Sequence, residues 1–310
     1  MAPAILACDL GGWQVISVWV KRYGRRVTHV GSGLWWGSLE GSDLSTLVTA
    51  AGGAGFSEVS ATPAMYFAAR AQGHTDAMLA ALVAESGVTV PVIDPLLRGL
   101  PGACPAANVG RRWRSTFEYD EDDCHRAADA LGSTVINLAH FLGSPTCFGA
   151  LVEAIGAITE RAVRRGRAIA VEAMPEGSIP DLATATAIVR AVASAGCGLT
   201  VDTWHWWRSG GDDAEIDDLA SGEVFVLQLS DAPAKVRASG TEPPMRDRLL
   251  PGAGAIPLTD VLGRVRNNNP LVHVGLEVFD TSAIDRTVDE RATAALGALR
   301  ALEARAAALG

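Results

Sequence analysis

Short, almost wholly apolar runs alternate with longer segments of helical spacing along most of this chain. The runs that we expect to form strands are 27–34, 56–61, 88–94, 134–140, 167–174, 198–204, 224–230 and 271–279. The segments with helical spacing are 43–54, 76–86, 122–131, 147–165, 181–195, 258–266 and 285–308. Two of these begin at an acidic residue suited to cap a helix and stop at glycine, from Asp43 to Gly55 and from Asp181 to Gly196. The pattern therefore predicts a succession of strand–helix units.

The apolar runs are continuous rather than alternating, which is typical of parallel strands covered by helices on both faces. Eight such units in one chain predict an α/β fold of the (β/α)8 TIM barrel type. An open, doubly wound sheet is the alternative topology. Its usual marker is a GxGxxG turn after the first strand, and Gly31-Ser32-Gly33 lacks the third glycine. We therefore favour the barrel.

The ends of the chain and two long loops complete the predicted organisation. Residues 1–26 precede the first unit and fit none of them, so we expect a short N-terminal extension, either a hairpin across the barrel floor or an irregular tail. The barrel itself would occupy 27–310. The segments 95–116 and 232–257 lack helical or strand periodicity and follow predicted strands, so we expect them to cover the barrel mouth.

Composition narrows the class of protein. The 310 residues carry a net charge of −9, which argues against nucleic acid as the main partner. The five cysteines are scattered and form no CxxC pair, so we expect reduced thiols in a cytoplasmic protein. No apolar run reaches the roughly 18 residues of a membrane span, and the N-terminus does not have the pattern of a signal peptide.

Four polar residues stand near the ends of apolar runs in the second half of the chain. They are Glu172, Asp202, Gln228 and Glu277, on the fifth to eighth predicted strands. A carboxylate is costly to bury unless it is paired or bound to a metal, and strand ends in this fold point into a shared mouth. We therefore expect the four to meet around one divalent cation. Any one of them could instead cap a helix or pair with an arginine.

This set of donors consists of oxygen atoms only, three carboxylates and one amide. Such a set suits Mn²⁺ or Mg²⁺ better than Zn²⁺. His205 lies three residues after Asp202 and could contact a substrate hydroxyl or support a ligand. The neighbouring tryptophans, Trp204 above all, could form a flat wall for substrate or belong to the core.

Weaker candidates surround this set. Asp231, three residues after Gln228, could hold the ligand loop or a partner of a ligand. Arg246 and Arg248, in the long loop after the seventh strand, could bind a carboxylate, hydroxyl or phosphate of a substrate, or lie in solvent. His140 and Glu58 are candidates for the same pocket.

Five stretches of this sequence resemble the xylose-isomerase-like TIM barrels, a superfamily of sugar isomerases, ketose 3-epimerases, inosose dehydratases and endonuclease IV. The stretches are 171–172, 201–205, 228–233, 248–254 and 275–279, and the resemblance extends from about residue 27 to the C-terminus. In the family, a Glu, Asp, His and Glu at these strand ends bind one divalent cation, commonly Mn²⁺. The resemblance implies that Glu172 and Glu277 are both ligands and acid/base residues, that Asp202 is a ligand and that His205 contacts substrate.

The chain departs from the family pattern at two positions. Gln228 stands where the family usually has a histidine ligand, and Ala253 stands where the glycine-rich loop often carries an acid. The chain has six histidines, too few near strand ends for the multi-zinc site of the endonucleases.

The resemblance implies a divalent-metal-dependent isomerase or epimerase that acts on a ketose or a related polyhydroxylated carbonyl compound. Mn²⁺ is the expected cofactor, with Mg²⁺ or Co²⁺ as alternatives. A lyase, either an inosose-type dehydratase or an enzyme that cleaves 3-keto-glycosides, is the first alternative, and a non-catalytic sugar-binding barrel is the second. We expect a sugar-like small molecule as partner, no nucleic acid and no membrane. The Ala/Leu face of the last helix is compatible with a homo-oligomer.

Overall fold

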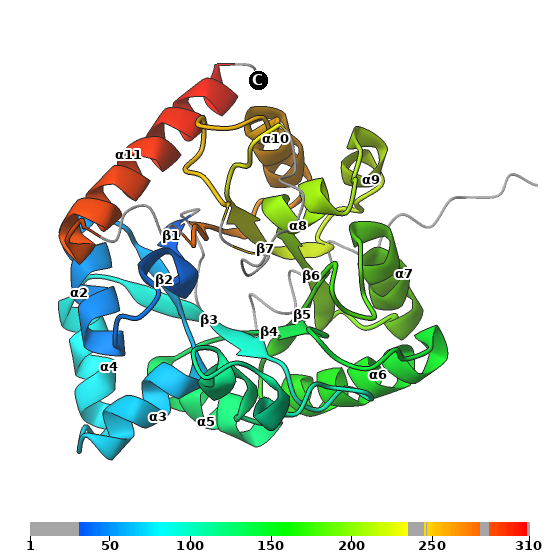
Figure 1. The fold of residues 1–310 in the computed structure, drawn as a ribbon, viewed down its shortest axis with the longest axis horizontal. Coiled ribbons are helices and arrows are strands. Elements are labelled where there is room, and N and C mark those ends of the chain that lie inside the picture. Colours follow the sequence, from blue (N-terminus) through cyan, green and yellow to red (C-terminus); the bar gives the residue numbers. More distant parts are fainter. Residues whose placement is uncertain (1–30, 235–244, 246, 280–284, 309–310) are drawn as a thin grey trace, which may run out of the picture.

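Eight parallel strands form a closed barrel in the computed structural model, which describes residues 31–234, 245, 247–279 and 285–308. Each strand pairs with its neighbours in the sequence, and the last pairs with the first (Figure 1). The strands are β1 Ser32–Leu34, β2 Glu58–Ala61, β3 Thr89–Leu96, β4 Val135–Ala139, β5 Ala168–Glu172, β6 Cys197–Asp202, β7 Val224–Leu229 and β8 His273–Leu276. The predicted TIM barrel is confirmed, and the open-sheet alternative is wrong. The predicted extension, 1–26, lies outside the described residues.

Helices surround the barrel and follow the strands in the order that the sequence predicts. They are α2 Leu44–Ala54, α3 Pro63–Ala71, α4 Asp76–Glu85, α5 Glu121–Leu131, α6 Phe148–Arg164, α7 Leu182–Val192, α8 Thr203–Arg208, α9 Asp213–Asp217, α10 Leu258–Asn268 and α11 Val288–Ala307. Asp43 and Asp181 cap α2 and α7, as predicted, by accepting hydrogen bonds from backbone amides three residues ahead. The helix α7 ends earlier than predicted, because Ala193 takes a left-handed conformation (φ 51°) before Gly196.

Two predicted strands are too long at their carboxyl ends. The run 198–204 stops at Asp202, whose side chain accepts hydrogen bonds from the amides of Trp204 and His205 and so starts α8. The run 271–279 forms a strand only to Leu276. In both places an apolar residue after the end of the strand, Trp204 or Phe279, is still buried, so the apolar run in the sequence is longer than the strand.

The barrel interior is filled by a small cluster of its own. The cluster contains Trp35, Val92, Val135, Ala170 and Val226. Trp35 lies directly against Gly33 and Gly275, where an added Cβ would come within 2.8 and 2.5 Å of its ring. Alternate residues of a strand share a face, so the next inward-facing residues lie one layer closer to the mouth. On β3, β4, β5 and β7 these are Asp94, Asn137, Glu172 and Gln228.

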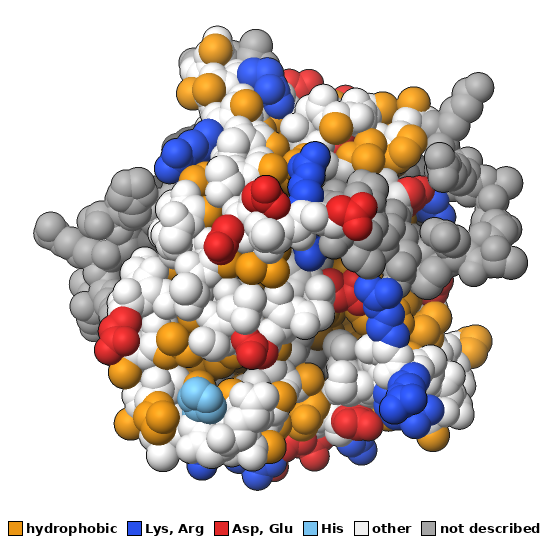
Figure 2. Space-filling view, turned by 60° about the vertical axis from the view of Figure 1, so that its left-hand side comes forward, with side chains coloured by type: hydrophobic (Ala, Val, Ile, Leu, Met, Phe, Trp, Pro, Cys, Tyr) orange, Lys and Arg blue, Asp and Glu red, His pale blue; other side chains and the backbone are white. Residues whose placement is uncertain are grey.

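The outer surface and the last helix bear on the predicted partners. Acidic and basic side chains are interspersed on the face drawn in Figure 2. Among the described residues, no helix combines the length and the hydropathy that a membrane span requires.

The helix α11 packs against α2 and α10 and buries Leu296, Leu299 and Leu302 there. Much of the apolar face that suggested self-association is therefore occupied within the chain, and self-association stays a prediction.

Candidate active site

Glu172, Asp202, Gln228 and Glu277 all lie at the carboxyl-terminal end of the barrel. Glu172 and Asp202 are the last residues of β5 and β6. Gln228 lies on β7 opposite Asp202 of the neighbouring β6, and Glu277 directly follows β8. Each is at most 4% exposed. The barrel thus gathers these four strand-end side chains in one buried layer.

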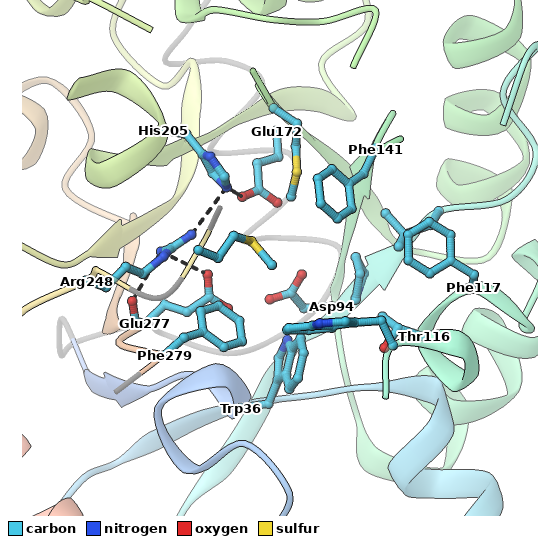
Figure 3. A pocket seen from close by; sticks show the side chains of 15 residues that line it. Trp36, Asp94, Thr116, Phe117, Phe141, Glu172, His205, Arg248, Glu277 and Phe279 are labelled. Carbon is cyan, nitrogen blue, oxygen red and sulfur yellow. Dashed lines mark hydrogen bonds and ion pairs between the residues drawn. The ribbon is translucent and has the colours of Figure 1, made fainter. Parts of the chain in front are cut away.

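Arg248 lies among these side chains. Its Nη1 donates to Asp202 Oδ2 at 2.6 Å and also reaches Glu277, at 3.2 Å to the backbone oxygen and 3.4 Å to Oε2. Its Nη2 lies 3.2 Å from His205 Nε2 (Figure 3). Arg248 is 2% exposed, so its charge depends on these carboxylates rather than on solvent. Of the two candidate arginines, Arg248 is in the site, and Arg246 lies outside the described residues.

A second network joins the site through Asn137, which sequence reasoning missed. Asn137 Nδ2 donates to Glu172 Oε2 at 2.6 Å and to Asp94 Oδ1 at 2.7 Å, and its Oδ1 accepts from Thr200 at 2.7 Å. Gln228 Nε2 donates to the other oxygen of Asp94 at 3.2 Å. Asp94 is therefore a fourth buried carboxylate of the site, and the amide of Asn137 holds it beside Glu172.

His205 occupies the space between Glu172 and Arg248. Its Nε2 lies 3.6 Å from Glu172 Oε1 and faces the Arg248 donor, which requires Nε2 to be the acceptor and places the proton on Nδ1. Burial lowers the pKa of His205 to about 4, with the Asp202 charge opposing and the two nearby guanidinium groups adding to the shift. The imidazole is therefore neutral at neutral pH and can act as an acceptor or a metal ligand.

The carboxylates respond differently to burial. Burial raises the pKa of Asp94 to about 6, and raises the pKa of Glu172 and of Glu277 well above the ordinary value, with the neighbouring carboxylates adding to each. Burial also opposes ionisation of Asp202, but Arg248 and His205 outweigh it and lower the pKa of Asp202. Four carboxylates thus face one guanidinium, and the excess negative charge favours a further cation.

These residues border a pocket at the carboxyl-terminal end of the barrel. Asp94, Glu172, His205, Arg248 and Glu277 line one part of it. The rest of the lining is largely aromatic and contains Trp36, Trp113, Phe117, Phe141 and Phe279. Trp113, Thr116 and Phe117 come from the excursion between β3 and α5, which confirms that the segment after β3 covers the mouth.

Other predicted site residues lie elsewhere. Both ring nitrogens of His140 are used by the backbone, with Nδ1 accepting from Ser178 and Nε2 bonded to the oxygen of Pro101, and His140 does not line the cavity. Glu58 begins β2 and pairs with His273 at the start of β8, so it lies at the opposite end of the barrel and its assignment to the pocket is wrong.

Trp204 and Asp231 support the site without lining the cavity. The Trp204 ring is fully buried beneath the guanidinium of Arg248, 5.0 Å away, and its Nε1 donates to Asp247. Asp231 accepts hydrogen bonds from the backbone amides of Ala232, Gly252, Gly254 and Ile256. It therefore holds the glycine-rich loop that follows Arg248.

The donor set suits a divalent cation. Glu172, Asp202 and His205 each offer a ligand atom, and these three atoms lie within 4.8 Å of one another. Gln228 Oε1 is buried without a hydrogen-bond partner among the described residues, so a further oxygen is free to bind. His205 thereby joins the candidate metal ligands, where the sequence suggested a substrate contact. The metal role of Glu277 stays a prediction.

Comparison with known proteins gives a family and a set of similar folds. The sequence profile described as "Xylose isomerase-like TIM barrel" matches residues 48–304. A search of curated proteins found no match. Among solved structures, an IolI protein with a bound zinc atom has a TM-score of 0.73 at 16% identity, covering 88% of this chain and 97% of its own.

Two further structures carry names that describe a reaction. A probable 3-DHS dehydratase, AsbF from Bacillus anthracis, has a TM-score of 0.63 at 14% identity, covering 87% of this chain and 98% of its own. A D-psicose 3-epimerase from Clostridium cellulolyticum has a TM-score of 0.61 at 15% identity, covering 88% and 99%.

One similar structure is much longer than this chain. The chain spans 43% of a xylose isomerase-like TIM barrel/4-hydroxyphenylpyruvate dioxygenase fusion protein, with a TM-score of 0.73 at 19% identity over 89% of this chain. At these identities, all four comparisons with solved structures establish the fold and not the substrate.

Proposed function

Because the chain belongs to the xylose isomerase-like TIM barrel family, we propose that it is a metal-dependent isomerase or epimerase that transfers a proton beside the carbonyl of a polyhydroxylated compound. The observation that carries the proposal is that two buried glutamates, Glu172 from β5 and Glu277 after β8, line one cavity together with His205 and Arg248. A base and an acid on one bound carbon are the requirement for moving a proton from one position to another.

Glu172, Asp202 and His205, with Gln228 and Glu277, would hold the cation, for which we propose Mn²⁺. A divalent cation at this position would stabilise the negative charge that develops on the substrate oxygens as the proton leaves. The oxygen-rich set supports Mn²⁺ or Mg²⁺, while the imidazole of His205 makes Zn²⁺ more acceptable than the sequence alone suggested.

The remaining residues orient the substrate and the two glutamates. Asn137 fixes one oxygen of Glu172, and Arg248 fixes one oxygen of Glu277. Removal of the proton by an ionised glutamate gives an enediolate, and the protonated partner returns the proton to the opposite face or to the neighbouring carbon. Burial raises the pKa of Glu172 and of Glu277 well above the ordinary value, which favours a protonated carboxyl at one of them.

A lyase is the second candidate, for two reasons. The chain is similar in fold to a probable dehydratase, and the aromatic wall of the cavity suits a bulky leaving group. The two candidates share the first step and differ in the product. In a lyase, the electrons left by the proton would expel a group from the next carbon. Product mass separates the two, since isomerisation leaves it unchanged and a lyase gives a product lighter by the expelled group, which is one water in a dehydration.

The test is a screen of ketoses, ketose phosphates, inososes and 3-keto-glycosides with Mn²⁺ in deuterium oxide, followed by mass. We expect deuterium uptake from solvent into one class, loss of uptake on chelation and recovery on adding Mn²⁺. Glu277→Gln should abolish uptake while exposed Glu153→Gln on α6 keeps it. Binding of a sugar without any uptake would favour the non-catalytic barrel instead, and uptake by Glu277→Gln at the normal rate would remove Glu277 from the mechanism.

A further inference from the structure

The cavity is divided into a charged part and an aromatic part. Nine of the fifteen lining residues are apolar, and among the polar ones all but Thr116 belong to the cluster around Glu172 and Arg248. A cavity for a free polyol would need hydrogen-bonding side chains along the whole substrate, because each unpaired hydroxyl that is buried costs free energy. The aromatic part offers few such groups, so the hydroxyls of a polyol would find few hydrogen-bond partners there.

The aromatic rings form two opposed walls. On one side, the centroid of Trp36 lies 5.4 Å from that of Phe279 and 6.2 Å from that of Trp113, and Trp113 lies 5.6 Å from Phe279. On the other side, Phe117 and Phe141 lie 6.0 Å apart. Figure 3 shows Trp36 and Phe279 across the cavity from Phe141 and Phe117, with Asp94 between them.

These rings are fixed by the fold rather than loosely placed. Trp36, Phe117, Phe141 and Phe279 are each at most 8% exposed, and they follow four different strands of the barrel. Rigid rings that contact one another lose little conformational entropy when a ligand enters. Met174 and Met245 complete the lining with flexible apolar side chains.

We propose that the aromatic part of this cavity is a binding subsite for an aryl group attached to the polyhydroxylated substrate. An aryl ring between opposed aromatic walls buries apolar area and makes edge-to-face or offset contacts with the rings. The sugar-like part would then lie beside Glu172 and Glu277. This inference rests on the proposed function for that half of the substrate only.

One buried donor of the aromatic part is unpaired. Trp36 Nε1 has no hydrogen-bond partner among the described residues, and Figure 3 shows Trp36 beside Asp94 of the charged part. A ligand oxygen between the sugar and the ring would give this donor an acceptor. The glycosidic oxygen of an aryl glycoside is such an atom.

The test compares two inert probes, phenyl β-D-glucoside and methyl β-D-glucoside, by titration calorimetry with the Mn²⁺-loaded protein. We expect phenyl glucoside to bind at least about ten-fold more tightly, which is about 1.4 kcal/mol. Phe141→Leu and Trp113→Leu should each reduce this preference by about three-fold or more with little change for methyl glucoside. Phe67→Leu, whose ring stacks on Tyr119 outside the cavity, is the matched control and should leave it unchanged.

Equal affinity for the two probes, no measurable binding of either, or an unchanged preference in both cavity variants would overturn the aryl subsite. Neither probe carries a carbonyl, so the measurement does not depend on turnover. A phenyl preference without deuterium uptake in any substrate class contradicts the proposed function alone. Deuterium uptake without a phenyl preference contradicts the aryl subsite alone.

Discussion

Arg248 Nη1 and Asp202 Oδ2 meet at 2.6 Å where neither side chain is more than 1% exposed. Arg208 forms a second pair nearby, 3.5 Å from Asp247, with both side chains partly exposed. Both guanidinium groups lie about equally close to the ring of Trp204, at 5.0 and 4.9 Å. The two arginines therefore differ in the burial of their carboxylate partners and in the number of contacts, since Arg248 also reaches Glu277 and His205.

Arg248→Met should lower the free energy of unfolding of the metal-free protein by about 3–5 kcal/mol, because it leaves the Asp202 carboxylate buried and unpaired. Arg208→Met should cost less than about 1 kcal/mol, since Asp247 can be solvated. Urea denaturation of the two variants measures both values. Divalent cations should restore part of the loss in Arg248→Met, and equal losses in the two variants would show that burial of Asp202 is not the deciding factor.

Asn137 holds Asp94 and Glu172 side by side, so the absence of charge on the Asn137 side chain is critical. Asn137→Asp keeps the size of the side chain but places a third carboxyl between two others, and it removes the donor that both now use. We expect a loss of about 3 kcal/mol or more in stability and a shift of the pH–rate profile, because Glu172 loses its fixed partner. The exposed Asn108→Asp is the control for added charge. A pH–rate profile identical to that of the wild type would restrict Asn137 to a purely structural role.

The acids at strand ends were readable from the sequence because burial makes them conspicuous. A polar residue at the end of an apolar run must be paired or ligated, and the closed barrel brings such ends together. Asp94 and Asn137 carry the same signal, since Asp94 ends the predicted strand 88–94 and Asn137 interrupts another apolar run. They could have been predicted by the same argument.

The direction of individual side chains and the course of the loops over the barrel mouth were harder to predict from the sequence. Asn137 and Ala139 share the inward face of β4, so His140 has the opposite parity and its ring binds backbone atoms instead of lining the cavity. The aromatic walls depend on how four separate loops fold back over the barrel mouth. Trp36, Trp113 and Phe279 are far apart in the sequence and have no shared pattern, so only their positions in space reveal the subsite.

Gln228 is the main departure from the ligand pattern of the family, and we expect it to weaken binding of metals that prefer nitrogen. Gln228→His replaces an amide by an imidazole and should raise Zn²⁺ affinity at least about ten-fold, with a smaller gain for Mn²⁺. Equilibrium dialysis with each metal measures the change. Gln72→His, on an exposed position beside α3, is the control for an added histidine. Unchanged Zn²⁺ affinity in Gln228→His would place this residue outside the metal site.

The metal-free protein should lose stability as the pH rises, because the pKa of Asp94 is raised from 3.8 to about 6 by burial. Between these two values the folded state keeps a proton that the unfolded state has released. Stability is therefore greatest below the unfolded pKa and falls as the pH passes the folded one. For Asp94 alone the loss is on the order of 2–3 kcal/mol, and the raised pKa values of Glu172 and Glu277 act in the same direction.

Urea denaturation in the presence of a chelator, from about pH 4 to about pH 7, measures this dependence. Asp94→Asn cannot release the proton, so its stability should fall less steeply than that of the wild type over the same interval. Saturating Mn²⁺ should flatten the wild-type curve, because a bound cation stabilises the ionised carboxylates. A wild-type stability that changes with pH by the same amount as that of Asp94→Asn would mean that folding does not raise the pKa of Asp94.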